Sequence, residues 1–251
     1  MESLNKNIDA YSLYIFDLDG TLYDQPLMRK KMAIRLLTYY MAHPFRIKEL
    51  LLLQKFRSVK DDEVDGITDS TDSSEGLSQR ECYTLSVDDD NGKRIDIDEI
   101  DLRICKKVAD KCGVDYKQVV NVVEYWIYKN PLDILYEVRD VKLLEYIAEL
   151  RKLGKKVAIL SDYPVKDKLE ALGQQVDAFY CASDEGIGKL KPSSKGILKV
   201  INDFSIDATD AVMVGDRMEK DGQAAIGANV DYLILERKVS KRNQLWHRLG
   251  I

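Results

Sequence analysis

The second half of the chain alternates short apolar runs with longer amphipathic stretches. The stretches VKLLEYIAELRKLG and SSKGILKVINDF space their apolar residues at helical intervals and predict helices. Strands are predicted at the apolar runs 155–162, 176–183, 210–216 and 230–236, with one more at 11–17. This order predicts an α/β fold, in which a Rossmann-like parallel sheet carries helices on both faces.

Between the first strand and residue 135 the pattern changes to long helical stretches broken by prolines. We therefore predict two domains. Residues 1–24 and 136–251 form the catalytic core, and residues 25–135 form a mainly α-helical cap inserted after the first strand.

Three details of the predicted cap follow from composition and local pattern. Residues near 60–80 are rich in Asp, Ser and Thr, which predicts an acidic, flexible loop starting at Lys60. The runs CYTLSV and KRIDI flank Asn91-Gly92, a turn dipeptide, and predict a β-hairpin. The aromatic residues of the cap are predicted to lie in its core: Tyr125, Trp126 and Tyr128.

The first cap helix combines basic residues with apolar ones, and two interpretations stay open. Arg29, Lys30, Lys31 and Arg35 alternate with the apolar set Met28, Met32, Ile34 and Leu36. The favoured interpretation is an ordinary amphipathic helix with its charged face in solvent. The alternative is a basic surface that attracts an anionic substrate or touches acidic lipid.

Composition and charge limit the classes of partner. The 251-residue chain has a formal charge of −5, which argues against bulk binding to nucleic acid. No run is long enough to span a bilayer, and no export-type leader is evident, so we expect a cytoplasmic protein without integral membrane contact. The four cysteines lack metal-site spacing and are expected to be free thiols. The oligomeric state stays open.

Candidate chemistry gathers at the ends of the predicted strands. In the stretch LYIFDLDGTLYD, Asp17 and Asp19 stand at the end of the apolar run, and the positions i and i+2 of an extended chain point the same way. Two such carboxylates persist together when a cation neutralises them or when one holds a proton. A hydroxyl (Ser161), a cation (Lys191) and a further acid (Asp216) follow other strands, and such strand ends meet at one edge of a parallel sheet.

Together, the segments DLDGTLYD, the Ser161 strand end, KLKP and GDRMEKD resemble the four ordered motifs of the haloacid dehalogenase-like superfamily of hydrolases. The resemblance implies the predicted core with an inserted cap, and an enzyme that hydrolyses phosphate monoesters. It makes Asp17 the nucleophile that forms an aspartyl-phosphate and Asp19 the general acid and base. A shared acid of this kind needs a raised pKa, which the nearby Asp17 would help to supply.

The same resemblance implies a metal and a phosphate site. Mg²⁺ is expected between the Asp17 carboxylate, the Asp19 backbone carbonyl and Asp216, while Asp221 is expected to support these ligands without touching the ion. Phosphate-binding residues are expected at Ser161, Lys191 and Thr21, with Lys189 a weaker alternative to Lys191 and the Thr21 hydroxyl orienting the loop.

Three alternatives differ in what they need from these residues. A dehalogenase would not need Asp19, because a leaving halide takes no proton. A phosphomutase uses the same core, and a non-catalytic protein that only binds phosphate would keep the fold without turnover. The favoured partner is a small phosphorylated metabolite.

Overall fold

The computed structural model describes residues 2–65, 84–88 and 93–249. The chain forms two compact units. Unit 1 comprises residues 1–29 and 133–251, and unit 2 comprises residues 30–132. No helix among the described residues has both the length and the apolarity that a membrane span needs.

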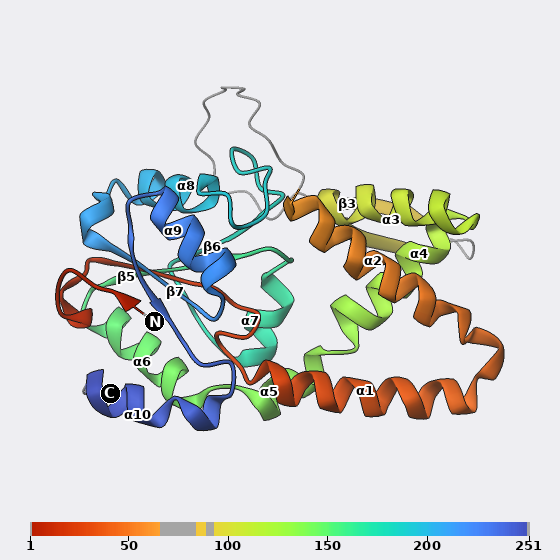
Figure 1. The fold of residues 1–251 in the computed structure, drawn as a ribbon, viewed down its shortest axis with the longest axis horizontal. Helices are drawn as coiled ribbons and strands as arrows, with labels where there is room; N and C mark the ends of the chain where they lie inside the picture. The colour runs from red at the N-terminus through yellow and green to blue at the C-terminus, as the bar shows by residue number, and fades with distance from the viewer. Residues whose placement is uncertain (1, 66–83, 89–92, 250–251) are drawn as a thin grey trace. The chain divides into compact units, whose positions relative to one another are not determined.

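Unit 1 is built on a six-stranded sheet with the order β1-β8-β7-β2-β5-β6 (Figure 1). Five strands are parallel, as the sequence predicts, and the short β1 pairs antiparallel with β8 at the edge. The bounds are β1 Glu2–Ser3, β2 Leu13–Phe16, β5 Lys156–Ser161, β6 Ala178–Cys181, β7 Ala211–Gly215 and β8 Asp231–Ile234. The first predicted strand, β2, therefore lies in the middle of the sheet.

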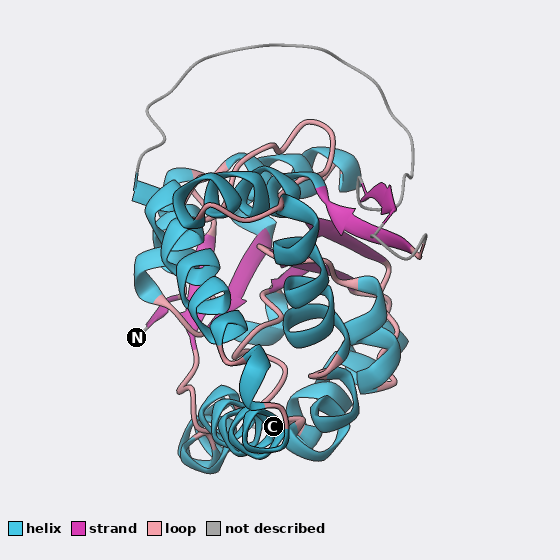
Figure 2. Ribbon diagram, turned by 90° about the vertical axis from the view of Figure 1, so that its right-hand side faces the viewer, coloured by secondary structure: helices cyan, strands magenta, loops and turns pink. Residues whose placement is uncertain are grey.

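Alternate residues of each strand face opposite helix layers, because side chains alternate along an extended chain. Leu13 and Ile15 of β2 pack with Ile197 in a core cluster beside α8 and α9. Tyr14 points the other way and meets Tyr146 of α6 edge to face. Figure 2 shows helices on both sides of the strands. The helices of this unit are α6 Val141–Lys152, α7 Lys166–Leu172, α8 Lys195–Phe204, α9 Gln223–Gly227 and α10 Asn243–Leu249.

Unit 2 is mainly helical and carries the predicted hairpin. β3 and β4 pair antiparallel, which confirms the pairing, while the Asn91-Gly92 turn lies outside the described residues. Trp126 is buried as predicted, whereas Tyr125 is exposed. The elements, some of which extend into unit 1, are α1 Gln25–Ala42, α2 Lys48–Asp65, β3 Thr84–Asp88, β4 Arg94–Asp98, α3 Glu99–Cys112, α4 Tyr116–Val123, a π-helical turn Glu124–Lys129 and α5 Leu132–Val138.

The predicted acidic loop does not start at Lys60. Helix α2 continues to Asp65, and residues 66–83 lie outside the described part of the chain. The physical reason is a buried ion pair: Lys60 Nζ lies 2.6 Å from Asp101 Oδ1, and the Tyr128 hydroxyl donates to the other oxygen at 2.6 Å. Composition alone does not reveal that this lysine is held in the core of the unit.

Replacing Lys60 by Met is expected to destabilise the protein by about 3–5 kcal/mol, because it leaves the Asp101 carboxylate buried without its counter-charge. Lys55→Met, at an exposed position of the same helix, is the matched control and is expected to change stability by less than about 0.5 kcal/mol. Urea denaturation followed by tryptophan fluorescence measures both. Equal losses in the two variants would contradict a structural role for the buried pair.

Candidate active site

The polar residues predicted from the sequence lie at the carboxyl ends of adjacent strands. Asp17 directly follows β2, Ser161 ends β5, and Asp216 directly follows β7. Because β2 lies between β5 and β7 and runs parallel to both, the three strand ends meet at one edge of the sheet. This is the edge at which open parallel sheets bind ligands.

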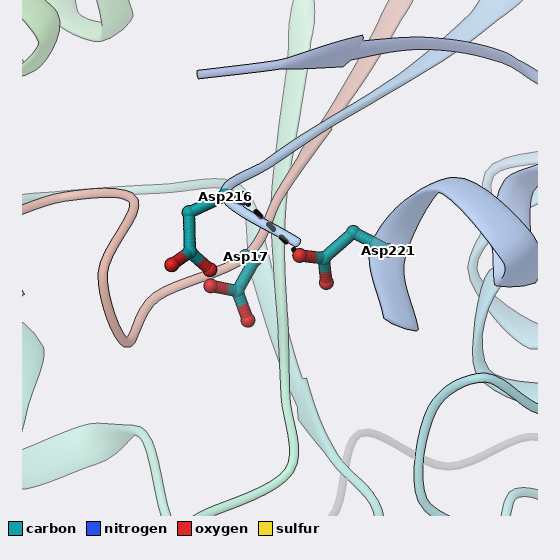
Figure 3. A group of neighbouring side chains, drawn as sticks. All are labelled: Asp17, Asp216 and Asp221. Atoms are coloured by element: carbon teal, nitrogen blue, oxygen red, sulfur yellow. Dashed lines mark hydrogen bonds between the residues drawn. The ribbon is translucent and has the colours of Figure 1, made fainter. Parts of the chain in front are cut away.

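Three buried carboxylates converge there. Asp17, Asp216 and Asp221 each offer an oxygen that lies within 4.8 Å of the others. Figure 3 shows Asp17 and Asp216 side by side, with Asp221 pointing toward them from the helical turn that precedes α9. The Asp221 carboxylate accepts hydrogen bonds from the backbone N–H groups of Asp216 at 3.2 Å and Arg217 at 3.0 Å. The strand end and the helix start are thereby tied together.

Lys191 brings a buried positive charge into this cluster. Its ammonium group lies 2.5 Å from Asp17 Oδ1 and 2.7 Å from Asp221 Oδ1, and it also donates to the Leu160 carbonyl at 3.2 Å. The structure thus brings Lys191 to Asp17, as its position before a proline predicts, and gives it the place for which Lys189 was the weaker alternative. Lys191 loses hydration on burial, but the surrounding carboxylates outweigh this loss and raise its pKa.

The charge balance of the cluster favours an additional cation. Burial, opposed by Lys191 and reinforced by the charges of Asp221 and Asp216, raises the pKa of Asp17 to about 8. Burial and the neighbouring Asp221 also raise the pKa of Asp216 to about 6. Burial is the main cause of both shifts and repulsion among the carboxylates adds to it, so a further cation would favour the ionised forms.

One oxygen of Asp216 supports the same conclusion. Asp216 Oδ2 is buried and accepts no hydrogen bond, although Arg237 Nε lies 3.2 Å away as an ion-pair partner. Buried carboxylate oxygens without donors are costly unless they bind a cation. Hard divalent cations such as Mg²⁺ prefer carboxylate oxygens, so Asp17, Asp216 and Asp221 fit such an ion. Asp221 lies in this cluster, where its hydrogen bonds to the backbone of Asp216 and Arg217 also suit the supporting role expected from the sequence.

Asp19 differs from the expectation of a raised pKa. Burial does disfavour its charged form, but Lys168 donates to both carboxylate oxygens at 2.7 Å and the Tyr23 hydroxyl donates at 2.7 Å. These contacts outweigh the burial and lower the pKa of Asp19. The carboxylate is therefore ionised in this arrangement, and the nearby Asp17 does not set its protonation.

The two hydroxyl residues have different surroundings. Thr21 is fully buried and donates from Oγ1 to Asp17 Oδ2 at 3.0 Å, a contact that suits an orienting hydroxyl. Ser161 is buried at the end of β5, and its Oγ accepts the backbone N–H of Tyr163 at 3.1 Å.

Three charged residues that contact the site were not among those predicted from the sequence. Lys168, on α7, pairs with Asp19. Asp162 accepts the backbone N–H of Lys191 at 2.9 Å and pairs with Lys220 at 3.2 Å. The position of Asp162, directly after Ser161 at a strand end, was an available signal. Lys168 and Lys220 are ordinary helical lysines in the sequence, so no local pattern marks them.

Arg242 holds the loop that follows Asp17. Its guanidinium group is fully buried and donates to the backbone carbonyls of Gly20 and Thr21, each at 2.6 Å. It also donates to Asp140 Oδ2 at 2.9 Å and to the Glu236 carbonyl at 2.6 Å. One side chain near the end of the chain therefore fixes the backbone beside Asp17 and Asp19.

Comparisons with known proteins agree with this geometry. A family model described as haloacid dehalogenase-like hydrolase matches residues 11–229, and the chain belongs to this family. It is also similar to a glyceraldehyde 3-phosphate phosphatase of Pyrococcus abyssi, with 38% identity over 80 residues. That match covers 30% of this chain and 33% of the relative, so it spans about a third of that protein's length.

Two solved structures share the fold. The HAD-hydrolase YfnB of Bacillus subtilis, described as bound to magnesium, gives a TM-score of 0.57 at 13% identity and covers 96% of this chain and 99% of its own. The defluorinating L-2-haloacid dehalogenase Rha0230 gives a TM-score of 0.57 at 15% identity and covers 94% and 86%. At these identities the likeness establishes the fold, the Rossmann-like α/β core predicted from the sequence.

Gly20 leaves the space in which Asp216 lies. It has a φ of +101°, and an added Cβ would lie 2.5 Å from Asp216 Oδ2. We expect Gly20→Ala to destabilise the protein by about 2–4 kcal/mol, through backbone strain and a steric clash together. Gly154→Ala is the matched control, because its φ of +77° is also left-handed but nothing lies within 4 Å of its added Cβ.

The control isolates the backbone term, which is expected to be about 1 kcal/mol. Chemical denaturation of both variants measures the difference. If Gly20→Ala costs no more than Gly154→Ala, the close approach of Asp216 to the glycine is wrong.

Proposed function

We propose that this protein is a Mg²⁺-dependent phosphatase that hydrolyses a small phosphate monoester through an aspartyl-phosphate on Asp17. The observation that carries the proposal is the position of the Asp17 carboxylate between a buried ammonium group, 2.5 Å away on Lys191, and the carboxylates of Asp216 and Asp221. A nucleophile placed here adjoins both a cation that suits phosphoryl oxygens and a group of ligands that suits a divalent metal.

The proposed reaction has two displacements. In the first, an Asp17 oxygen attacks phosphorus, the bond from phosphorus to the ester oxygen breaks, and the leaving oxygen takes a proton from Asp19. In the second, Asp19 accepts a proton from water, the resulting hydroxide attacks phosphorus, and the bond to Asp17 breaks to release inorganic phosphate. Covalent catalysis by a carboxylate divides one difficult displacement into two easier ones.

Lys191 and Ser161 are the proposed contacts for the phosphoryl oxygens. Lys191 shares its charge between Asp17 and Asp221, so it lies where negative charge develops during transfer. Asp17, Asp216 and the Asp19 backbone carbonyl, with Asp221 close by, would hold Mg²⁺, which when bound neutralises charge shared by the nucleophile and the phosphate. Thr21 orients Asp17 through its hydroxyl.

Asp19 separates this proposal from dehalogenation. Carbon–halogen cleavage releases a halide that takes no proton, whereas an ester oxygen needs one. In the present arrangement Lys168 and Tyr23 hold the Asp19 carboxylate in its ionised form. Proton donation by Asp19 therefore requires that its contact with Lys168 loosen when substrate binds and that the carboxylate first take up a proton from solvent. The named phosphatase relative supports the same choice over a short part of the chain.

The main test replaces the nucleophile. Asp17→Asn is expected to abolish Mg²⁺-dependent hydrolysis of p-nitrophenyl phosphate, because an amide oxygen does not form the aspartyl-phosphate. Asp207→Asn, at an exposed position, is the matched control and is expected to retain wild-type activity. Chelation of the metal is expected to remove the activity of both wild type and control, and re-addition of Mg²⁺ is expected to restore it.

Wild-type inactivity across a broad panel of phosphate monoesters with Mg²⁺ would overturn the proposal and favour a binding protein. Turnover that needs a bisphosphate activator and yields an isomer, with no inorganic phosphate released, would show a phosphomutase.

Asp19→Asn distinguishes the two hydrolytic chemistries. We expect it to lower kcat for phosphate esters by about 10²–10⁴-fold, since it removes the proton donor and acceptor. The purified wild type and variant are also assayed on 2-chloropropionate. Halide release that is preserved in Asp19→Asn would identify a dehalogenase instead.

A further inference from the structure

Exposed apolar side chains concentrate on the α1–α2 segment of unit 2. Of the fifteen large hydrophobic residues that are exposed among the described residues, seven fall between positions 34 and 51. Residues 41–48 form an uninterrupted exposed run, and Phe45 at its centre is 98% exposed. We call the following residues the α1–α2 patch: Ile34, Leu37, Met41, Phe45, Ile47 and Leu51.

These side chains are additional to the core of the unit. Met32 and Tyr40 on α1, and Leu53 and Phe56 on α2, already provide buried apolar side chains. On α1 the exposed members recur at helical spacing, so Ile34, Leu37 and Met41 share a face. Arg29 and Lys30 are exposed, as an amphipathic helix predicts, but these apolar residues are exposed as well. Exposed apolar residues gathered in one segment of a chain are typical of an interaction site.

The surroundings of the patch are strongly basic. Residues 30–58 contain seven lysine and arginine residues and a single acid, Glu49, a net charge of +6 in a chain of −5. Glu49 is itself paired with Arg46 at 2.7 Å. Lys30 precedes Ile34 by one turn on α1, and Lys48 and Lys55 flank Leu51 on α2. Exposed apolar residues thus alternate with positive charge along both helices.

We propose that the α1–α2 patch docks this protein on an anionic lipid surface, with Phe45 and its apolar neighbours inserted among the headgroups and the lysines contacting the lipid charges. Helices that lie in a membrane interface combine these two features. A second copy of the chain would bring two surfaces of the same strong charge together, which opposes association. Nucleic acid is stacked mainly by aromatic rings, whereas five of the six patch residues are aliphatic.

Vesicle flotation tests the proposal with the full-length chain. Binding is expected to phosphatidylcholine vesicles that contain 30% phosphatidylglycerol and to be absent with phosphatidylcholine alone. Addition of 0.5 M NaCl is expected to weaken it, because salt screens the attraction between the lysines and the headgroups.

Two variants probe the apolar and the charged parts. Phe45→Asp is expected to weaken binding about tenfold or more, since it removes the most exposed apolar side chain. Leu153→Asp is the matched control, because Leu153 is an exposed apolar residue of unit 1. Lys48→Glu is expected to weaken binding about fivefold or more, and Lys142→Glu, at an exposed site of α6, is its control.

The result that overturns the proposal is equal binding to neutral vesicles, no flotation at all, or equal losses in the controls. Sedimentation velocity in the absence of lipid is the companion measurement. A concentration-dependent dimer that Phe45→Asp abolishes would assign the patch to a second copy of the chain instead. Neither measurement depends on phosphatase activity, so the proposal stands or falls independently of the proposed reaction.

Discussion

Mutual repulsion among Asp17, Asp216 and Asp221 is the constraint around which the catalytic edge is organised. Three carboxylates with oxygens within 4.8 Å of one another are stable only where positive charge is brought to them. The fold supplies it through Lys191 and leaves an oxygen of Asp216 ready for a further cation. The Asp221 side chain also packs directly against the backbone at the end of β7. Gly215 leaves room for it, because a Cβ there would lie 2.4 Å from atoms of the Asp221 side chain. The parallel strands bring the three carboxylates together, the glycine leaves space for them, and Lys191 offsets part of their charge.

The sheet and the acidic residues at its edge were predictable because both leave local signals. A buried strand is an apolar run, and a polar residue directly after it, such as Asp17 or Asp216, lies at the edge where parallel strands end. The contacts of Asp19 left no comparable signal. Lys168 reaches it across 149 positions of the chain, and nothing about a lysine on a short helix indicates which carboxylate it meets. The direction of the pKa shift at Asp19 depended on that contact and was therefore predicted with the wrong sign.

In unit 2, the burial of individual side chains was also not predictable from the local sequence. Lys60 begins an acidic, polar stretch and reads as solvated, yet it is buried because Asp101 and Tyr128 provide a partner network. Ile34 belongs with Met32 to the apolar set of an amphipathic helix, yet Ile34 is exposed whereas Met32 is buried. Hydrophobic periodicity predicts that a segment is helical and how wide its apolar face is. It does not give the number of neighbouring elements available to cover that face.

The contacts of the Arg242 guanidinium group limit when the site can be completed during synthesis of the chain. It contacts the carbonyl of Thr21, which precedes it by 221 positions. At the usual speed of synthesis, roughly 10–45 seconds pass on the ribosome between the appearance of the two residues. During that interval the loop beside Asp17 exists without the group that fixes its carbonyls. The catalytic edge begins at the first parallel strand to be made, but it is completed only by one of the last helical segments, so a nascent chain does not acquire its finished geometry before the C-terminal segment has docked.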